Sequence, residues 1–138
     1  MLTIYINELG DEAVNNPSEP SIDGAPVRRF KNPKYQNVGS NLAELRQKID
    51  LIDSQIIELL AQRALCVQDA TRFKKDEFQV AAPARQAQVF ERVKSQAEAH
   101  KENFPNFPEI VETTYRTLVA GFIASEQLLF QKTEIIQQ

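Results

Sequence analysis

The feature that most constrains this chain is a long apolar stripe with helical spacing. Between residues 45 and 73, residues of one face recur at alternating intervals of four and three, which is the period of an α-helix. The positions are Leu45, Ile49, Ile52, Ile56, Leu59, Arg63, Cys66, Ala70 and Phe73. No proline or glycine interrupts the chain between Gly39 and Pro83. The pattern predicts one helix from about residue 42 to about residue 75, capped by Ser40 or Asn41.

A helix of this length is too long for one small domain to cover. At about 1.5 Å per residue it extends for roughly 50 Å, whereas a compact domain of this size has a radius of gyration of only about 14 Å. The rest of one chain can hardly bury so long an apolar face. We therefore expect a second copy of the chain to cover it, which predicts a homodimer.

Two further helices complete the predicted fold. The second begins near Pro83, which suits a first helical turn, and fades around His100. Its inner face carries Val89, Val93 and Ala97. The third follows Asn106, whose spacing to Glu109 is that of a capping box. Its predicted inward stripe is Val111, Tyr115, Leu118, Phe122 and Leu129. The fold class is therefore all-α, a three-helix chain with a long first helix.

Residues 1–40 differ in composition from the helical domain expected over residues 41–138. They hold three of the four glycines and four of the seven prolines, so they cannot form a long helix. We expect a largely irregular N-terminal arm. Residues 3–6 form either a short strand or a docking contact, unless the whole start of the chain is a disordered tail.

Charge and composition exclude several classes of protein. The net charge of −3 argues against non-specific binding to nucleic acid, which needs a basic surface. No apolar run approaches the roughly 18 residues of a membrane span, and the short apolar start lacks the basic region of a signal peptide. Cys66 is the single cysteine and His100 the single histidine, so we expect no disulfide, no zinc site and a cytoplasmic location.

Two cations occupy the predicted apolar face of the first helix. Arg63 stands where a leucine is expected, and in a straight helix Lys74, eleven residues later, returns to within about 20° of the same direction. An unpaired buried charge is very costly, so both cations need anionic partners. Either acidic residues of other helices neutralise them, or they line a pocket for a small dianion that arginine grips through paired hydrogen bonds.

Two other arginines extend this set. Arg46 precedes Arg63 by 17 residues, which in a straight helix places it about 25 Å away. Only an antiparallel second copy would bring it to the same pocket. Arg85, in the first turn of the second helix, is either a further pocket residue or an ordinary surface charge.

These residues resemble the all-α chorismate mutase family over about residues 41–130. The segment LRQKIDLIDSQIIELLAQR, which ends at Arg63, is similar to the signature of the family's first helix. The resemblance continues through Arg72-Phe73-Lys74, Ala82-Pro83-Ala84-Arg85 and the helix that ends with Phe122-Ile-Ala-Ser-Glu126-Gln127. The joint spacing of the four cations is quite specific, whereas no single element of it would be.

The resemblance implies an intertwined homodimer with two active sites, each shared between chains, that needs no cofactor. Its substrate would be a small dicarboxylate, chorismate or isochorismate, rearranged or cleaved in one concerted step. Arg63 and the partner subunit's Arg46 would bind the two carboxylates. Lys74 would donate to a carboxylate and to the ether oxygen whose bond breaks, and Arg85 would support the carboxylate network.

Two departures from the family pattern bear on the activity. Mutases of the family commonly carry a carboxylate after the arginine that matches Arg85, where it binds the ring hydroxyl of chorismate, but this chain has Gln86. They also tend to have an acid at the position of Ala82. The pattern looks more like the isochorismate pyruvate lyase branch, whose products are salicylate and pyruvate. The alternatives are a chorismate mutase that forms prephenate, and a non-catalytic helical dimerisation or ligand-sensing module.

The last helix leaves one choice open. An ungapped alignment places Glu126 where relatives often have a glutamine that donates to the ether oxygen, and Gln127 is the rival if the register slips by one. Glu126 follows Phe122 by four residues, whereas Gln127 is rotated by about 100°. An ionised carboxylate cannot donate, so Glu126 would have to carry a proton in this role. Otherwise it is an ordinary exposed glutamate.

Overall fold

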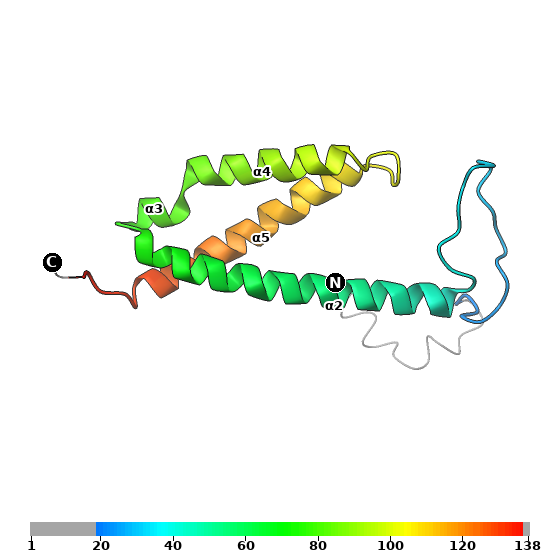
Figure 1. The fold of residues 1–138 in the computed structure, drawn as a ribbon, viewed down its shortest axis with the longest axis horizontal. Helices are drawn as coiled ribbons and strands as arrows, with labels where there is room; N and C mark the ends of the chain where they lie inside the picture. Colours follow the sequence, from blue (N-terminus) through cyan, green and yellow to red (C-terminus); the bar gives the residue numbers. More distant parts are fainter. Residues whose placement is uncertain (1–18, 137–138) are drawn as a thin grey trace. The chain divides into compact units, whose positions relative to one another are not determined.

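The structure, a computed structural model, describes residues 19–136, and within them it is all-helical (Figure 1). Its elements in chain order are α2 (Leu42–Ala70), the 3-10 turn η1 (Thr71–Phe73), α3 (Glu77–Ala81), α4 (Pro83–Glu98) and α5 (Phe107–Phe130). The contact suggested for residues 3–6 lies outside the described residues. None of the described helices is long and apolar enough to cross a membrane.

The chain divides into two compact units, and the division falls within α2, between Ile57 and Glu58. In the first unit, residues 19–41 have neither helix nor strand. The backbone N–H of Ala43 donates to the carbonyl of Ile22 at 2.7 Å, which ties this segment to the start of α2. Asn41 caps the helix, because its Oδ1 accepts from the backbone N–H of Glu44 at 2.9 Å.

The end of α2 differs from the sequence prediction. The α-helix stops at Ala70, about five residues early, and continues only as the tight turn Thr71–Phe73. Lys74 follows in an extended conformation, with φ −98° and ψ 134°. The hydroxyl of Thr71 donates to the carbonyl of Val67 at 3.1 Å, a local bond of the kind that competes with continued helix. The prediction that Arg63 and Lys74 share one continuous helix face was therefore wrong.

No residue of α2 is buried within one chain. Members of its predicted apolar stripe are largely exposed, including Ile52 at 53% and Leu59 at 62%. A helix face of this kind normally packs against another element. The stripe is thus present as predicted, and one chain leaves it uncovered.

The core of the second unit lies between α4 and α5. Val89 and Val93 of α4 pack against Val119 of α5, and all three are buried. Half-buried residues surround them: Phe90, Val111, Tyr115 and Ile123. The predicted inward stripe of α5 was therefore right for Val111 and Tyr115, but Val119 and Ile123 replace Leu118, Phe122 and Leu129 in this core. Much of α5 is apolar, so its packing partner α4, rather than its own periodicity, selects the buried face.

Short connections place α3 against α5 and lead into α4. The carboxylate of Asp76 caps α3 by accepting from the backbone N–H of Gln79 at 2.9 Å, and Val80 is buried beneath it. Ala82 ends α3 in a left-handed conformation with φ 46°, and Pro83 opens α4 directly afterwards. Lys74, which precedes α3, donates from its Nζ to the carbonyl of Gln79 in α3.

The capping box predicted at the start of α5 does not form. Asn106 precedes the helix as expected, but it has φ 60° and its side chain accepts no capping hydrogen bond. Asparagine tolerates the left-handed region better than most residues, and here it serves to turn the chain.

Candidate active site

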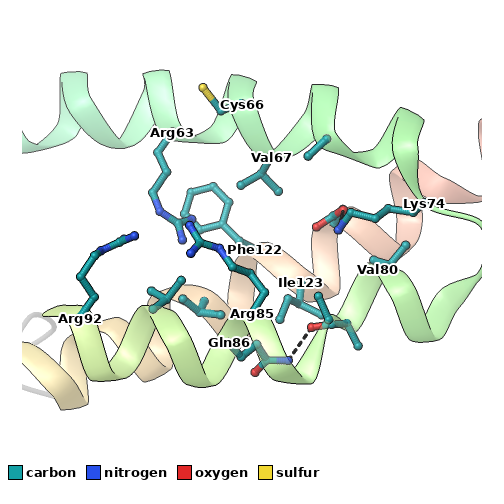
Figure 2. A pocket seen from close by; sticks show the side chains of 16 residues that line it. Arg63, Cys66, Val67, Lys74, Val80, Arg85, Gln86, Arg92, Phe122 and Ile123 are labelled. Atoms are coloured by element: carbon teal, nitrogen blue, oxygen red, sulfur yellow. Dashed lines mark hydrogen bonds and ion pairs between the residues drawn. The ribbon is translucent and has the colours of Figure 1, made fainter. Parts of the chain in front are cut away.

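A cavity of about 420 Å³ lies within the second unit. The C-terminal part of α2, the end of α3 and the facing sides of α4 and α5 form its walls (Figure 2). Part of its lining is apolar and includes Val89, Val119, Phe122 and Ile123. The charged residues of the lining are Arg63, Lys74, Arg85, Arg92 and Glu126. With four cations and a single carboxylate, the cavity suits a small ligand that carries more than one negative charge.

Arg63 brings an unpaired hydrogen-bond donor into the cavity. Its side chain extends from α2 into the cavity toward Arg85 (Figure 2), with Cζ 4.9 Å from the ring centre of Phe122. Its Nη1 is buried and has no hydrogen-bond partner among the described residues. Buried donors are nearly always satisfied, and an arginine nitrogen in a low-dielectric site is costly to leave unpaired. A bound carboxylate would supply the acceptor.

Arg92 is a pocket residue that the sequence analysis missed. It follows Arg85 by seven residues, two turns of α4, so both arginines lie on the face that carries Val89. Figure 2 shows the Arg92 side chain reaching into the same space as Arg63. In the described part of the chain, neither Arg85 nor Arg92 has a carboxylate within ion-pair distance. The seven-residue spacing from Arg85 was the signal that could have identified it.

Lys74 and Glu126 form the other end of the cavity. Lys74 Nζ lies 3.5 Å from Oε2 of Glu126 and donates to the carbonyl of Gln79 at 3.2 Å. Glu126 is 5% exposed, and the hydroxyl of Thr71 lies 3.3 Å from the same Oε2. Because Lys74 comes from the turn after η1, the tertiary fold rather than helical periodicity places it here.

Gln86 and Gln127, the two glutamines predicted for the site, have different positions. Gln127 is outside the cavity lining: its Nε2 donates to the carbonyl of Glu77 at 3.2 Å, which ties α3 to α5. Gln86 lines the cavity, and its Nε2 donates to the carbonyl of Ala81 at 2.7 Å (Figure 2). Glu126 is thus the member of the pair Glu126–Gln127 whose side chain lines the cavity.

The structure brings together most of the predicted site residues. Arg63, Lys74, Arg85, Gln86 and Glu126 all line the cavity. Arg46 is exposed and belongs to the first unit, whereas the cavity is built from the second. The lining offers carboxylate-binding cations and hydrogen-bond donors, and no group of three or more potential metal-binding side chains occurs in residues 19–136.

Comparisons with known proteins identify the family of this chain. The chorismate mutase type II family matches residues 45–127, a range that includes all the charged residues of the cavity. The isochorismate pyruvate lyase of Pseudomonas aeruginosa is 31% identical over 94 residues, which are 68% of this chain and 89% of that protein. The chain therefore belongs to the chorismate mutase type II family and is an enzyme of that family.

Proposed function

We propose that the cavity binds isochorismate and that the main activity is isochorismate pyruvate lyase, with salicylate and pyruvate as products. The observation that carries this choice is Gln86. Its amide lines the cavity at the position where mutases commonly hold the chorismate hydroxyl with a carboxylate, and its nitrogen is already engaged by Ala81. A neutral side chain there weakens the preference for chorismate, and similarity to the Pseudomonas aeruginosa lyase supports the same choice.

Binding of the substrate would rest on the cations. The unpaired Nη1 of Arg63 needs an acceptor, and Arg85 and Arg92 add charge on the facing side of α4. One substrate carboxylate fits this arginine group, where planar guanidinium groups can donate in pairs. Lys74 would donate toward the ether oxygen from the opposite end.

The proposed reaction needs orientation and hydrogen-bond donors rather than a nucleophile. A hydrogen moves from the ring to the methylene carbon of the enolpyruvyl group, and the bond between the ether oxygen and the ring carbon breaks. The ring becomes salicylate and the enolpyruvyl group becomes pyruvate, so no other reactant is needed. Negative charge grows on the ether oxygen as this bond breaks. Hydrogen-bond donors already positioned at that oxygen lower the barrier, and the shape of the cavity holds the enolpyruvyl group of the substrate over its ring.

Glu126 is the proposed second donor to the ether oxygen. It lines the cavity beside Lys74, in a position that is nearly inaccessible to solvent. An ionised carboxylate would repel the substrate dianion, so Glu126 must be protonated when it acts. Gln127 is not proposed for this role, because its side-chain nitrogen donates to the backbone carbonyl of Glu77.

The same proposal includes a homodimer with Arg46 contributed by the partner subunit. Two observations support it: the apolar stripe of α2 is exposed in one chain, and Arg46 belongs to the unit that does not form the cavity. A second copy covering α2 would bury the stripe. The partner subunit's Arg46 would then bind the second substrate carboxylate.

Product analysis tests the proposal. Purified protein is incubated separately with isochorismate and chorismate, and the products are identified. Salicylate and pyruvate from isochorismate, with a higher kcat/KM than for any reaction of chorismate, is the expected result. The second candidate is chorismate mutase, favoured by the family match; prephenate as the main product would replace the lyase assignment with it.

A further inference from the structure

We infer that Thr71 is a positioning residue: its hydroxyl fixes which oxygen of Glu126 faces the substrate and carries the proton. The inference rests on the proposed role of Glu126. Thr71 is 3% exposed and lies in the turn η1 that ends α2 early. Its hydroxyl is 3.1 Å from the carbonyl of Val67 and 3.3 Å from Oε2 of Glu126, so it links the turn to α5.

Both donors near Glu126 address the same oxygen. Thr71 Oγ1 and Lys74 Nζ approach Oε2, at 3.3 Å and 3.5 Å. A proton on Oε2 would compete with an ammonium group and a hydroxyl, which makes Oε2 the acceptor of the carboxylic acid. The proton then resides on Oε1. Glu126 keeps this proton during the reaction and only donates a hydrogen bond through it.

The hydroxyl of Thr71 has one proton and two acceptors within reach. When Glu126 is ionised, the charged Oε2 is the stronger acceptor and draws the hydroxyl away from Val67. When Glu126 is protonated, the two acceptors are more nearly equal. In either form the hydroxyl can donate to Oε2, and without it only Lys74 fixes the orientation of the carboxyl group.

Other charged groups face the same cavity and affect Glu126 in both the native enzyme and its variants. They are Arg63 with the thiol of Cys66 from α2, Lys74 from the turn, and Arg85 with Arg92 from α4. The end of α3 contributes only Val80 and Ala81. Since none of these groups changes when Thr71 is substituted, a change in kcat that Thr71→Ser restores reports on the Thr71 hydroxyl.

The test compares Thr71→Val, which removes the hydroxyl and keeps the shape, with Thr71→Ser, which keeps the hydroxyl. Thr114→Val is the matched control, because Thr114 makes the same local bond, to the carbonyl of Ile110 at 2.7 Å, on the exposed surface of α5. Values of kcat and KM for isochorismate and chorismate are measured separately for each variant. Thermal unfolding identifies variants that do not fold, and Thr71→Ala replaces Thr71→Val in that event.

For Thr71→Val we expect kcat to fall about tenfold with little change in KM, because the carboxyl group of Glu126 is no longer held in one orientation. Thr71→Ser should restore kcat, and Thr114→Val should match the native enzyme. An unchanged kcat in Thr71→Val, or no rescue by Thr71→Ser, overturns the inference while the proposed function stands, since the native enzyme is active. If the native enzyme converts neither substrate, the proposed function itself fails.

Discussion

Lys74 Nζ lies 3.5 Å from Oε2 of Glu126, so a cation from the turn after α2 and an acid from α5 meet at one end of the cavity. Glu126 offsets one of the four cations in the lining and leaves Arg63, Arg85 and Arg92 without an acidic partner in the described chain. A substrate that draws Lys74 to its own oxygens weakens the contact between Lys74 and Glu126. Lys74 is therefore shared between the substrate and Glu126 in the proposed complex.

The first prediction concerns the donor at the ether oxygen. Glu126→Gln should preserve kcat at neutral pH, because an amide donates without needing a proton, whereas Glu126→Ala should lower kcat. The kcat values of both variants provide the measurement, with Glu112→Gln as a control on the same helix outside the cavity. Equal kcat values for Glu126→Gln and Glu126→Ala would exclude Glu126 as the donor.

The second prediction concerns substrate choice. Gln86→Glu should shift the ratio of kcat/KM toward chorismate, because the new carboxylate can accept from the ring hydroxyl; a change on the order of tenfold corresponds to one such charged hydrogen bond. Gln88→Glu adds the same charge on an exposed position of α4 outside the lining and should leave the ratio unchanged. A native preference for chorismate would contradict the lyase assignment but not the family.

The third prediction concerns the shared site. Arg46→Ala and Arg63→Ala should each lower activity by about a hundredfold, since each removes a charged contact to a substrate carboxylate. After the two variants are unfolded and refolded together, about a quarter of native activity should return, because half of the dimers are mixed and each has one intact site. Mixed dimers that form but remain inactive would show that Arg46 does not act across chains.

The fourth prediction concerns Arg92. Arg92→Ala should raise KM for isochorismate about tenfold while kcat changes less, because the residue adds charge to the cavity at a distance from the proposed ether-oxygen donors. Arg92→Lys should recover part of the loss. Lys94→Ala is the control: Lys94 lies on α4 outside the cavity and pairs with Glu112 at 3.3 Å. Equal KM values for Arg92→Ala and Lys94→Ala would remove Arg92 from the binding site.

The fifth prediction concerns stability. The hydrogen bond from Arg116, followed by that from Lys94, holds the pKa of Glu112 below its usual value. The contact with Lys94 joins α4 to α5 away from the cavity. A lowered folded-state pKa stabilises the fold above the unfolded-state pKa, and this contribution is lost as pH falls through the folded-state value. Glu112→Gln should therefore lower Tm at neutral pH and converge with the native protein in acid. A Tm difference that does not vary with pH would contradict this account.

Much of the architecture was predictable because it depends on local spacing. The alternation of four and three in α2, the proline that opens α4 and the family signature around Arg63 and Lys74 are all visible in the sequence. The all-α fold and the family followed from these features and were confirmed. The sequence also marked Arg63, Lys74, Arg85, Gln86 and Glu126, which line the cavity in the structure.

Spacing along one helix does not decide which faces meet, and the tertiary structure differs from the sequence predictions at that level. Lys74 reaches the cavity because the α-helix ends at Ala70 and the chain passes through the turn Thr71–Phe73 into an extended residue. The face of α5 that packs against α4 carries Val119 and Ile123, rather than the Leu118, Phe122 and Leu129 that its periodicity predicted. Arg92, and the shared contact of Thr71 and Lys74 with one oxygen of Glu126, depend on the close approach of residues distant in sequence. The sequence therefore determined which helices form and which charges the chain carries, whereas only the packing of those helices decided which charges share a cavity.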